Sequence, residues 1–423
     1  MTDADFIVLG AGPAGATAAH GLADKGHSVL LLDKDDFPRD KACGGGLCPH
    51  IMDFPYVRET MDDYLESVCT RGMIFSPSLT KSIDHRSETP LFYNIRRKKF
   101  DHQLVKFAQE QGAELRKTHV KDVSENNEMV TVTTTDGTEL TAKALVGATG
   151  PYDPAAKYVR ERTGQVPTWK DDEIGTILVH EFPVPRSFID DAYGEERLAI
   201  IHLMTAGLLD GGYGYGWVFS KNDVLNIGYG GFKKDMKLVD RKEVFRKYLG
   251  VLRKDGYFPD DVELDKFKGA PLPLKGAIRT TFYNRMLIAG DAAGFVSPIS
   301  GEGIYYAMDS GRIAANVLHD ATMKEGSGGN LGSGSGGTGT GAFSSNALSR
   351  YQKEWGNEWG RDLNILKFFA NRLMAWPEAI VRYGMKDELL KKYLVGIFIS
   401  TESADKLKMK IAARVIRNFL MFH

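Results

Sequence analysis

Residues 5–33 constrain the fold of this chain more than any other stretch. They read DFIVLGAGPAGATAAHGLADKGHSVLLLD, which predicts a strand over residues 6–9, a glycine-rich turn, a helix to about residue 25 and a second strand over residues 28–32. A strand, a tight glycine turn and a helix in this order begin a βαβ unit that binds phosphates. The sequence therefore predicts a Rossmann-like domain with a parallel sheet.

The glycines and the acid of this stretch each meet a requirement of a bound dinucleotide. Gly10 permits the tight turn, Gly12 lets backbone amides approach a pyrophosphate, and Gly15 lets the helix pack closely on the strand. The positive end of the helix dipole then faces the phosphates. Asp33 stands where a carboxylate accepts hydrogen bonds from ribose hydroxyls. Together these features predict a dinucleotide site rather than a turn that only packs.

Length and composition exclude several classes of protein. A chain of 423 residues is longer than a single hydrophobic core usually supports, so two or three domains are expected. The formal net charge of −1 argues against a nucleic-acid binder, which needs a concentrated basic surface. Three cysteines are too few for a disulfide framework, which favours a cytoplasmic protein. No apolar run reaches the roughly 20 residues of a spanning helix, so peripheral membrane contact alone stays open.

A second glycine-rich segment, CGGG at residues 43–46, follows the first βαβ unit. Consecutive glycines are most useful where the backbone lies against something flat, and a flexible surface loop is the alternative. Cys43 is a candidate catalytic residue that shapes the site or relays a proton, and a small packing residue is the alternative. Cys48 and His50 lie nearby, but no second ligand pair follows at usable spacing, so no metal site is expected.

The glycine turn at residues 10–15 is a first loop-to-helix junction. A second one follows a short apolar strand at residues 285–289. The segment GDAAGFVSPISGEGI places Asp291 just after that strand and Gly303 just before a small-residue helix that continues to about residue 319. Such a junction offers backbone amides and a carboxylate to the same ligand as the first junction. A helix cap is the alternative role of Asp291.

Between the two junctions, residues 158–274 alternate in short strands with turns rich in Gly, Pro, Asp and Asn, which is typical of an antiparallel sheet. Tyr215, Trp217 and Phe219 alternate on one of these strands, so their side chains point to one face. They either line an apolar substrate tunnel or form an ordinary sheet core. In the first case Tyr215 and Trp217 are catalytic candidates, and Tyr213 is a further substrate-binding candidate.

Four motifs in one order resemble those of a known enzyme group. The GAGPAG turn, the CGGG loop, the RxxFD segment (Arg97, Phe100, Asp101) and the GDAAG…GEGI block are similar to those of flavoprotein monooxygenases and reductases with the para-hydroxybenzoate hydroxylase fold. Within that group, YxWxF at residues 215–219 together with CGGG resembles the geranylgeranyl reductase family, including archaeal digeranylgeranylglycerophospholipid reductases. Gly212 and Ser220 stand where the family motif has proline.

The resemblance implies an FAD-dependent reductase that saturates isolated C=C bonds of geranylgeranyl chains, in archaeal-type membrane lipid precursors or in geranylgeranyl diphosphate. NADPH, ferredoxin or reduced flavin would be the external electron donor. The alternatives are an FAD monooxygenase or halogenase on the same scaffold and a non-enzymatic prenyl-binding escort protein. The residues expected to bind FAD are Gly10, Gly12, Ala14, Gly15, Asp33, Cys43, Gly44, Gly46, Arg97, Val120, Asp291, Gly303 and Ile304.

The expected fold class is α/β, α+β overall, with an antiparallel-sheet substrate domain inserted into the FAD-binding domain and a helical region at the C-terminus. From about residue 404 the last helix alternates apolar residues with Lys and Arg, which fits either core packing or contact with anionic lipid. The expected parts are FAD-binding residues 1–67, 94–157 and 275–325, substrate-domain residues 68–93 and 158–274, a flexible Gly/Ser loop at 326–345, and the helical region 346–423.

Overall fold

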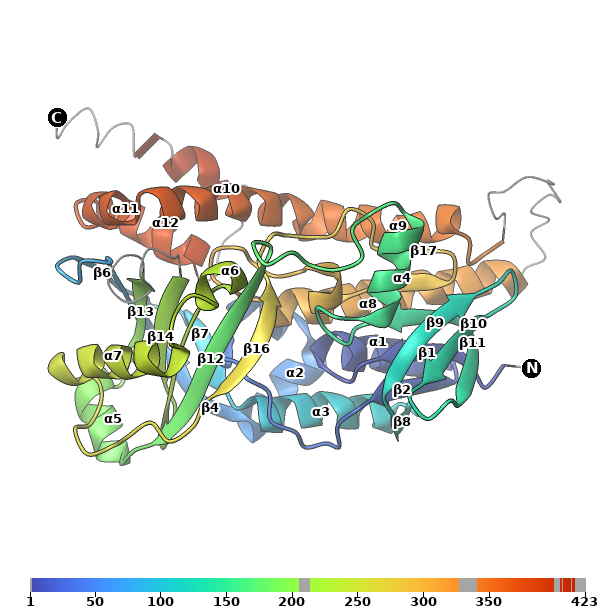
Figure 1. Cartoon of the computed structure of the whole chain (residues 1–423), viewed down its shortest axis with the longest axis horizontal. Coiled ribbons are helices and arrows are strands. Elements are labelled where there is room, and N and C mark those ends of the chain that lie inside the picture. The colour runs from blue at the N-terminus through green and yellow to red at the C-terminus, as the bar shows by residue number, and fades with distance from the viewer. Residues whose placement is uncertain are drawn as a thin grey trace.

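The computed structural model describes residues 2–204, 214–326, 341–398, 404, 406–411 and 413–414. Gly212 and Tyr213 therefore lie outside the described residues, as do residues 327–340 of the Gly/Ser tract and most of the helix expected after residue 403. In the part that is described, the strands form three sheets, and helices pack around them (Figure 1).

The eight-stranded sheet has the parallel centre that the first stretch predicts. β1 (Ala4–Leu9) pairs in parallel with β2 (Val29–Asp33) on one side and with β11 (Glu139–Gly147) on the other. β8 (Glu114–Lys117) and β18 (Met286–Ile288) extend this parallel arrangement. Most of the side chains of β1 and β2 are buried, because helices cover both faces of such a sheet. The Rossmann-like sheet is confirmed.

Three further strands complete this sheet with antiparallel pairs. β10 (Val130–Thr134) pairs with β9 (Val120–Glu125) and with β11, and β17 (Phe282–Tyr283) pairs with β18. The turn between β10 and β11 contains Asp136 and Gly137, and Gly137 has a φ of +88°. Glycine adopts this conformation without steric cost, which explains the hairpin at this position.

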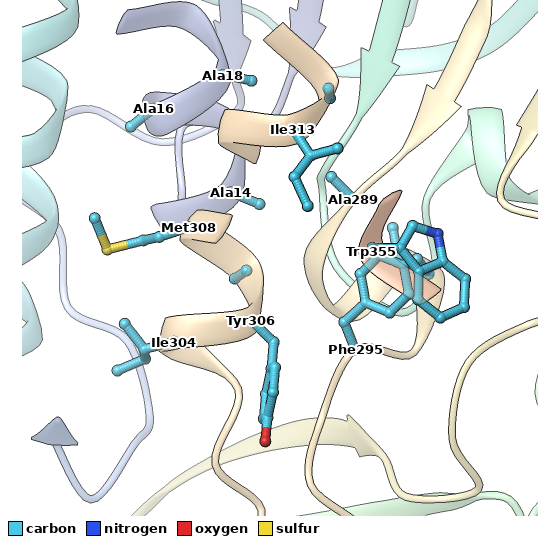
Figure 2. Close-up of a cluster of buried hydrophobic side chains, with 14 of the residues drawn as sticks. Ala14, Ala16, Ala18, Ala289, Phe295, Ile304, Tyr306, Met308, Ile313 and Trp355 are labelled. Atoms are coloured by element: carbon cyan, nitrogen blue, oxygen red, sulfur yellow. The ribbon is translucent and has the colours of Figure 1, made fainter. Parts of the chain in front are cut away.

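Two small-residue helices pack closely and bring the two glycine junctions together. α1 (Pro13–Asp24) follows β1, and α8 (Ile304–Gly326) follows the second junction. A Cβ on Gly311 of α8 would lie 2.2 Å from the carbonyl oxygen of Ala14 in α1. Figure 2 shows Ala14 and its neighbours on α1 beside the residues that begin α8. The close approach therefore depends on glycine and alanine at the contact.

The seven-stranded sheet is antiparallel except for one pair, β13 with β5, which is parallel. One face packs on α5 (Arg186–Tyr193) and α7 (Arg241–Lys254) in a separate hydrophobic cluster. In spatial order its strands are β16 (Lys268–Pro273), β12 (Ile174–Pro183), β15 (Val224–Phe232), β14 (Gly214–Ser220), β13 (Ala199–Met204), β5 (Arg71–Phe75) and β6 (Ser82–Arg86).

The strands between residues 65 and 95 divide between two sheets. β5 and β6 join the seven-stranded sheet, whereas β4 (Leu65–Cys69) and β7 (Phe92–Ile95) form a three-stranded sheet with β3 (Gly46–Leu47). β3 is the end of the CGGG loop, so this small sheet ties that loop to the strand that precedes α3 (Arg97–Glu110).

The helices after residue 344 form a layer along the top of the view in Figure 1. Trp355 and Trp359 anchor this layer, because both rings pack on the buried Phe295 with centroid distances of 4.8 Å. No helix in the described ranges has the length and apolarity that crossing a bilayer requires. The remaining helices are α2 (Pro55–Glu59), α4 (Pro154–Arg162), α5 (Arg186–Tyr193), α6 (Lys233–Met236), α7 (Arg241–Lys254), α9 (Ser345–Trp355), α10 (Arg361–Ala375), α11 (Pro377–Gly384) and α12 (Glu388–Phe398).

The contact between α1 and α8 predicts different effects for two Gly→Ala changes within helices. Gly311→Ala places a methyl group against the backbone of Ala14, so we expect a loss of about 3 kcal/mol in the free energy of unfolding. Gly250→Ala in α7 meets nothing within 4 Å, and should stabilise the protein by about 0.5–1 kcal/mol through helix propensity. Urea denaturation of both variants measures this, and equal stability of Gly311→Ala and wild type would contradict the packing.

Candidate functional site

A cavity of about 950 Å³ lies where the two junctions, the CGGG loop and the seven-stranded sheet meet. It has the size of a typical ligand site. It brings together fifteen of the residues that the sequence singled out, from segments far apart in the chain. They are Gly10, Gly12, Ala14, Asp33, Cys43, Gly44, Gly46, Arg97, Val120, Tyr215, Trp217, Phe219, Asp291, Gly303 and Ile304.

The glycines of the first turn have different roles. Gly10 has a φ of +89°, and a Cβ there would lie 2.5 Å from the carbonyl oxygen of Ala148. A Cβ on Gly12 would meet only the Arg39 side chain, at 3.6 Å, so the backbone at Gly12 is open to the cavity. Gly15 does not line the cavity, because it packs against the turn, where a Cβ would lie 1.8 Å from the Gly10 carbonyl oxygen.

Asp33 ends β2 and braces the first turn. One carboxylate oxygen accepts a hydrogen bond from the backbone N–H of Ala11 at 2.7 Å, and the other accepts one from the N–H of Asp35 at 2.9 Å. A carboxylate has about four acceptor positions, so two bonds leave capacity for ribose hydroxyls. Asp33 is half-buried on the cavity wall, which suits that role.

The CGGG loop is packed on both sides. A Cβ on Gly44 would lie 2.7 Å from the ring of Phe219, and one on Gly45 would lie 2.3 Å from the carbonyl oxygen of Ile95. Gly45 also has a φ of +76°. The loop thus fits as a thin backbone layer between the aromatic strand β14 and the small sheet, and it is not a flexible surface loop.

A buried ion cluster lies beside this loop. Arg97 donates two hydrogen bonds to Asp101, from Nε at 2.7 Å and from Nη2 at 2.8 Å, and Arg39 pairs with Asp101 at 3.2 Å. Burial lowers the pKa of Arg97, but Asp101 and Cys43 outweigh this effect and raise it above its ordinary value. Arg97 therefore places a permanent positive charge on the cavity wall, whereas Arg96 does not line the cavity and pairs with the buried Glu66.

The second junction places two carboxyl groups in the cavity wall. Burial raises the pKa of Asp291, and the nearby cations Lys41 and Arg97 oppose that shift. Glu302 accepts a hydrogen bond from the backbone N–H of Tyr305 at 2.9 Å. Burial nevertheless raises the pKa of Glu302 to about 7, more than the backbone hydrogen bonds at the start of α8 lower it. Glu302 can therefore carry or release a proton near neutral pH.

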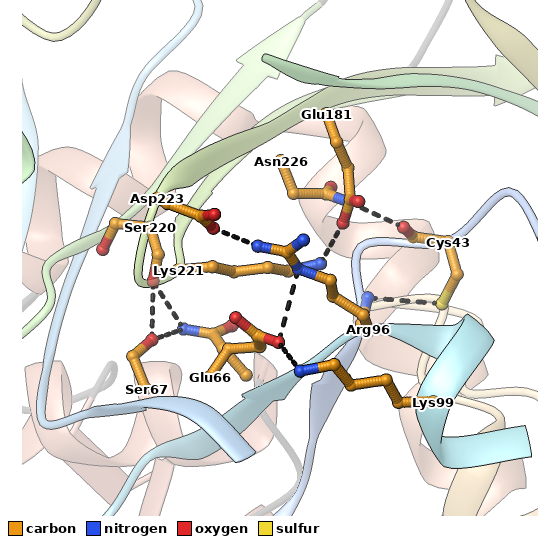
Figure 3. A network of polar contacts seen from close by, with 12 residues as sticks. Cys43, Glu66, Ser67, Arg96, Lys99, Glu181, Ser220, Lys221, Asp223 and Asn226 are labelled. Atoms are coloured by element: carbon orange, nitrogen blue, oxygen red, sulfur yellow. Dashed lines mark hydrogen bonds and ion pairs between the residues drawn. The ribbon is translucent and has the colours of Figure 1, made fainter. Parts of the chain in front are cut away.

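A polar network supports the loop and the aromatic strand from behind (Figure 3). Asn226 accepts a hydrogen bond from Trp217 Nε1 at 2.9 Å and donates one to the carbonyl oxygen of Cys43 at 3.0 Å. It also donates to Glu181 at 3.3 Å, and Glu181 pairs with the buried Lys221. Burial raises the pKa of Glu181, but Lys221 lowers it below its ordinary value. Asn226 thus fixes Trp217 and the Cys43 peptide relative to each other.

The far end of the cavity is apolar. Tyr215, Trp217 and Phe219 line it from β14, while Gly216 and Val218 face the cluster around α5 and α7 on the other side of the sheet. The Tyr215 hydroxyl donates to the carbonyl oxygen of Ser300. Further apolar walls come from β5, β12, β13 and α12, and their cavity-lining side chains are Met73, Ile74, Ile177, Ala199, Ile201, Val395 and Phe398.

Sequence reasoning missed Lys41, Glu302 and the walls from β5, β13 and α12. Glu302 carried a local signal, because it lies within the GEGI segment before α8. The apolar residues carried no local signal, because in the sequence each looks like an ordinary core residue. Only the folded chain shows that they line the cavity. Tyr213 lies outside the described residues. Among the residues that the structure places, no group of His, Cys, Asp and Glu has the arrangement of a metal site.

Comparison with known proteins gives one family. A family model described as pyridine nucleotide-disulphide oxidoreductase matches residues 4–175. Menaquinone reductase of Mycobacterium tuberculosis is 28% identical over 327 residues, 74% of this chain and 76% of the relative. Digeranylgeranylglycerophospholipid reductase 2 of Methanopyrus kandleri is 26% identical over 421 residues, 97% of this chain and 96% of the relative. Both relatives are named as reductases.

The fold matches a solved structure over nearly the whole chain. A geranylgeranyl bacteriochlorophyll reductase-like protein from Thermoplasma acidophilum aligns with a TM-score of 0.74 and 19% identity, covering 96% of this chain and 98% of the other. This likeness shows a common fold and confirms the expected α/β class with an added antiparallel sheet.

The relatives support a reductase, as the CGGG and YxWxF motifs predict, ahead of a monooxygenase, a halogenase or an escort protein. Geranylgeranyl diphosphate reductase of Rhodobacter capsulatus is 30% identical over 319 residues, which are 74% of this chain and 74% of the relative. Identity at this level over this share of both chains shows family membership. The chain belongs to the geranylgeranyl reductase family of FAD-dependent oxidoreductases.

Proposed function

We propose that this protein holds FAD in the cavity and saturates isolated C=C bonds of a geranylgeranyl chain that lies along the aromatic strand. The observation that carries this proposal is the juxtaposition of Phe219 and Trp217 with the CGGG loop, on which their rings pack. The flat ring of the cofactor and the apolar geranylgeranyl chain would meet at that loop. The substrate is an archaeal-type lipid precursor or geranylgeranyl diphosphate.

The chain has a suitable group for each part of FAD. Gly12 and the N-terminus of α1 would hold the pyrophosphate, Asp33 the ribose hydroxyls, and Asp291 the ribityl or ribose hydroxyls. The amides at Gly303 and Ile304 would face the pyrimidine edge, where a helix N-terminus stabilises negative charge. FAD held by these residues would supply a hydride, with electrons that come from an external donor such as NADPH, ferredoxin or reduced flavin.

The aromatic strand suits an unconjugated alkene. Such an alkene has no carbonyl to take up charge, so positive charge develops at carbon and water must be kept away. Trp217 and Tyr215 offer apolar faces with negative π density, which exclude water and stabilise a cation-like centre. Trp217 is 4% exposed and its indole N–H is already bonded to Asn226, so its ring position is fixed before substrate binds. Asn226 acts as a positioning residue for this wall.

Saturating an alkene also requires a proton, and two cavity groups can provide one. Glu302 holds its proton at a carboxyl oxygen with a pKa of about 7, so it can donate near neutral pH and be reloaded. Cys43 lies in the loop itself, where its Sγ accepts from the Gly45 N–H at 3.4 Å. We assign the role of proton donor to Glu302. Cys43 then has a structural role in the CGGG loop.

The substrate class is tested by weighing products. Dithionite-reduced protein is incubated with geranylgeranyl diphosphate, with a digeranylgeranyl glycerophospholipid and with menaquinone, the last because a menaquinone reductase is among the relatives. We expect mass gains of two hydrogens per reduced bond in one or both geranylgeranyl compounds. Reduction of menaquinone alone would contradict the proposed substrate class.

Trp217 variants test the aromatic wall. Trp217→Ala should lower kcat/KM for a geranylgeranyl substrate by about 100-fold, because it removes the wall that excludes water. Trp217→Phe keeps an aromatic face and should lose about tenfold or less, through the lost bond to Asn226. The absorption spectrum of bound flavin checks that both variants keep their cofactor. Full activity of Trp217→Ala with its flavin bound would remove this residue from the site.

The pH dependence of turnover tests the proton source. Glu302 is protonated below a pKa of about 7, so wild-type kcat should fall as the pH rises through that value. Glu302→Gln keeps an oxygen for the Tyr305 N–H but has no proton to give, so kcat should drop about 100-fold and lose this pH dependence. Cys43→Ser is the matched variant and should keep the wild-type profile. A flattened profile in Cys43→Ser, but not in Glu302→Gln, would reverse the assignment.

A further inference from the structure

The C-terminal part of this chain carries a net positive charge, although the whole chain is almost neutral. Residues 361–423 contain 12 Lys and Arg but 6 Asp and Glu, whereas the whole chain has 54 basic and 55 acidic residues. Eight of those basic side chains are exposed in the described part, against one exposed acidic side chain, Glu388. Glu388 itself bonds to Lys391 at 2.7 Å, and the buried Asp387 pairs with Arg414 at 3.1 Å. The exposed charged side chains of this helical region are therefore mainly basic.

Exposed apolar side chains gather in the same region. Among the described residues, ten large hydrophobic side chains are exposed, and half of them lie beyond residue 361. α10 buries Leu366 and Leu373, while Phe368 on the same helix is 54% exposed and Trp376, which caps its C-terminus, is 58% exposed. Arg372 lies between the two rings, 4.9 Å from the Phe368 centroid and 5.6 Å from that of Trp376. The other three exposed side chains are Met385, Leu389 and Met409.

The inner side of the same layer reaches the cavity. α12 begins near the exposed Leu389 and ends at Val395 and Phe398, which line the apolar end of the cavity. The Phe398 ring packs edge-on against Tyr215 with a centroid distance of 5.6 Å. At 1.5 Å per residue, about 13 Å of helix separates the exposed end from the cavity. α12 packs on β6 of the seven-stranded sheet and on α11 (Figure 1).

We propose that the outer side of α10 to α12, defined by Phe368, Arg372, Trp376, Met385 and Leu389, docks on an anionic membrane surface. Aromatic and aliphatic side chains enter the headgroup region, and surrounding Lys and Arg attract anionic lipid. Protein–protein interfaces are depleted in lysine, so the exposed lysines favour lipid as the partner. The inference rests on the proposed function in one step: a polyprenyl lipid would pass from the bilayer along α12 into the cavity.

Tryptophan fluorescence makes this surface testable, because Trp376 is exposed and the other four tryptophans, Trp169, Trp217, Trp355 and Trp359, are at most 9% exposed. The full-length flavoprotein is mixed with vesicles of equal parts phosphatidylglycerol and phosphatidylcholine that carry a brominated, quenching acyl chain. We expect quenching of the exposed indole, weak quenching by pure phosphatidylcholine vesicles, and loss of binding in about 0.5 M salt. The Trp376→Phe variant should lose the quenched component.

Paired variants separate docking from other effects. Phe368→Ser with Trp376→Ser should lower vesicle binding, measured by co-sedimentation, at least about tenfold. Leu238→Ser is the matched control, since Leu238 is 85% exposed on the segment after α6, and its vesicle binding should be unchanged. Equal binding by the double variant and wild type, or no preference for phosphatidylglycerol, would overturn the proposal. Vesicle binding involves no turnover, so it fails or holds independently of alkene reduction, which is assayed with detergent-dispersed geranylgeranyl diphosphate.

Discussion

The close approach of α1 and α8 is the contact on which the rest of the site depends. Gly311 lies directly against the backbone at Ala14, and Gly290 lies against the Ala14 methyl group. Larger side chains here would separate the two helices and move their N-termini apart. Because the residues are small, two helix starts that are distant in the sequence face one cavity. The combined dipoles of the two helix starts give that cavity a positive potential, which suits the anionic dinucleotide that we propose binds there.

Strand β14 lies where the glycine-lined part of the cavity meets its apolar part. Its alternation places Trp217 and Phe219 toward the cavity and Val218 toward the helices α5 and α7. Asn226 then ties the Trp217 indole to the Cys43 carbonyl, so that the aromatic strand and the CGGG loop form one rigid unit. A buried amide with both ends bonded stabilises a unique arrangement more than an apolar residue of similar size would. Chemistry between a flat cofactor and a prenyl chain requires such fixed spacing.

Local patterns in the sequence predicted the parts of the site that depend on backbone shape. Gly10, Gly12 and Asp33 could be placed because a tight turn and a helix start leave a fixed spacing of glycines and acid. Gly15 packs closely against the turn, as its spacing predicts, and unlike Gly10 and Gly12 it does not line the cavity. A glycine pattern indicates the backbone geometry of a turn, but it does not indicate which side of the turn faces a ligand.

The apolar walls could not be predicted, because their positions depend on tertiary packing. Ile201 on β13 and Phe398 on α12 have the burial pattern of any core residue, and only the assembled sheets and helices bring both to one cavity. The division of residues 65–95 between two sheets has the same origin, since strand partners are distant in sequence. The pKa of Glu302 likewise depends on burial at the assembled α8 junction.

A diffraction structure of the protein with FAD and a geranylgeranyl compound bound tests the central claim most directly. We expect isoalloxazine density along the CGGG loop, with the pyrophosphate at the N-terminus of α1 and the prenyl chain against Trp217. Density for the flavin away from residues 43–46, or a prenyl chain that does not contact strand β14, would contradict it.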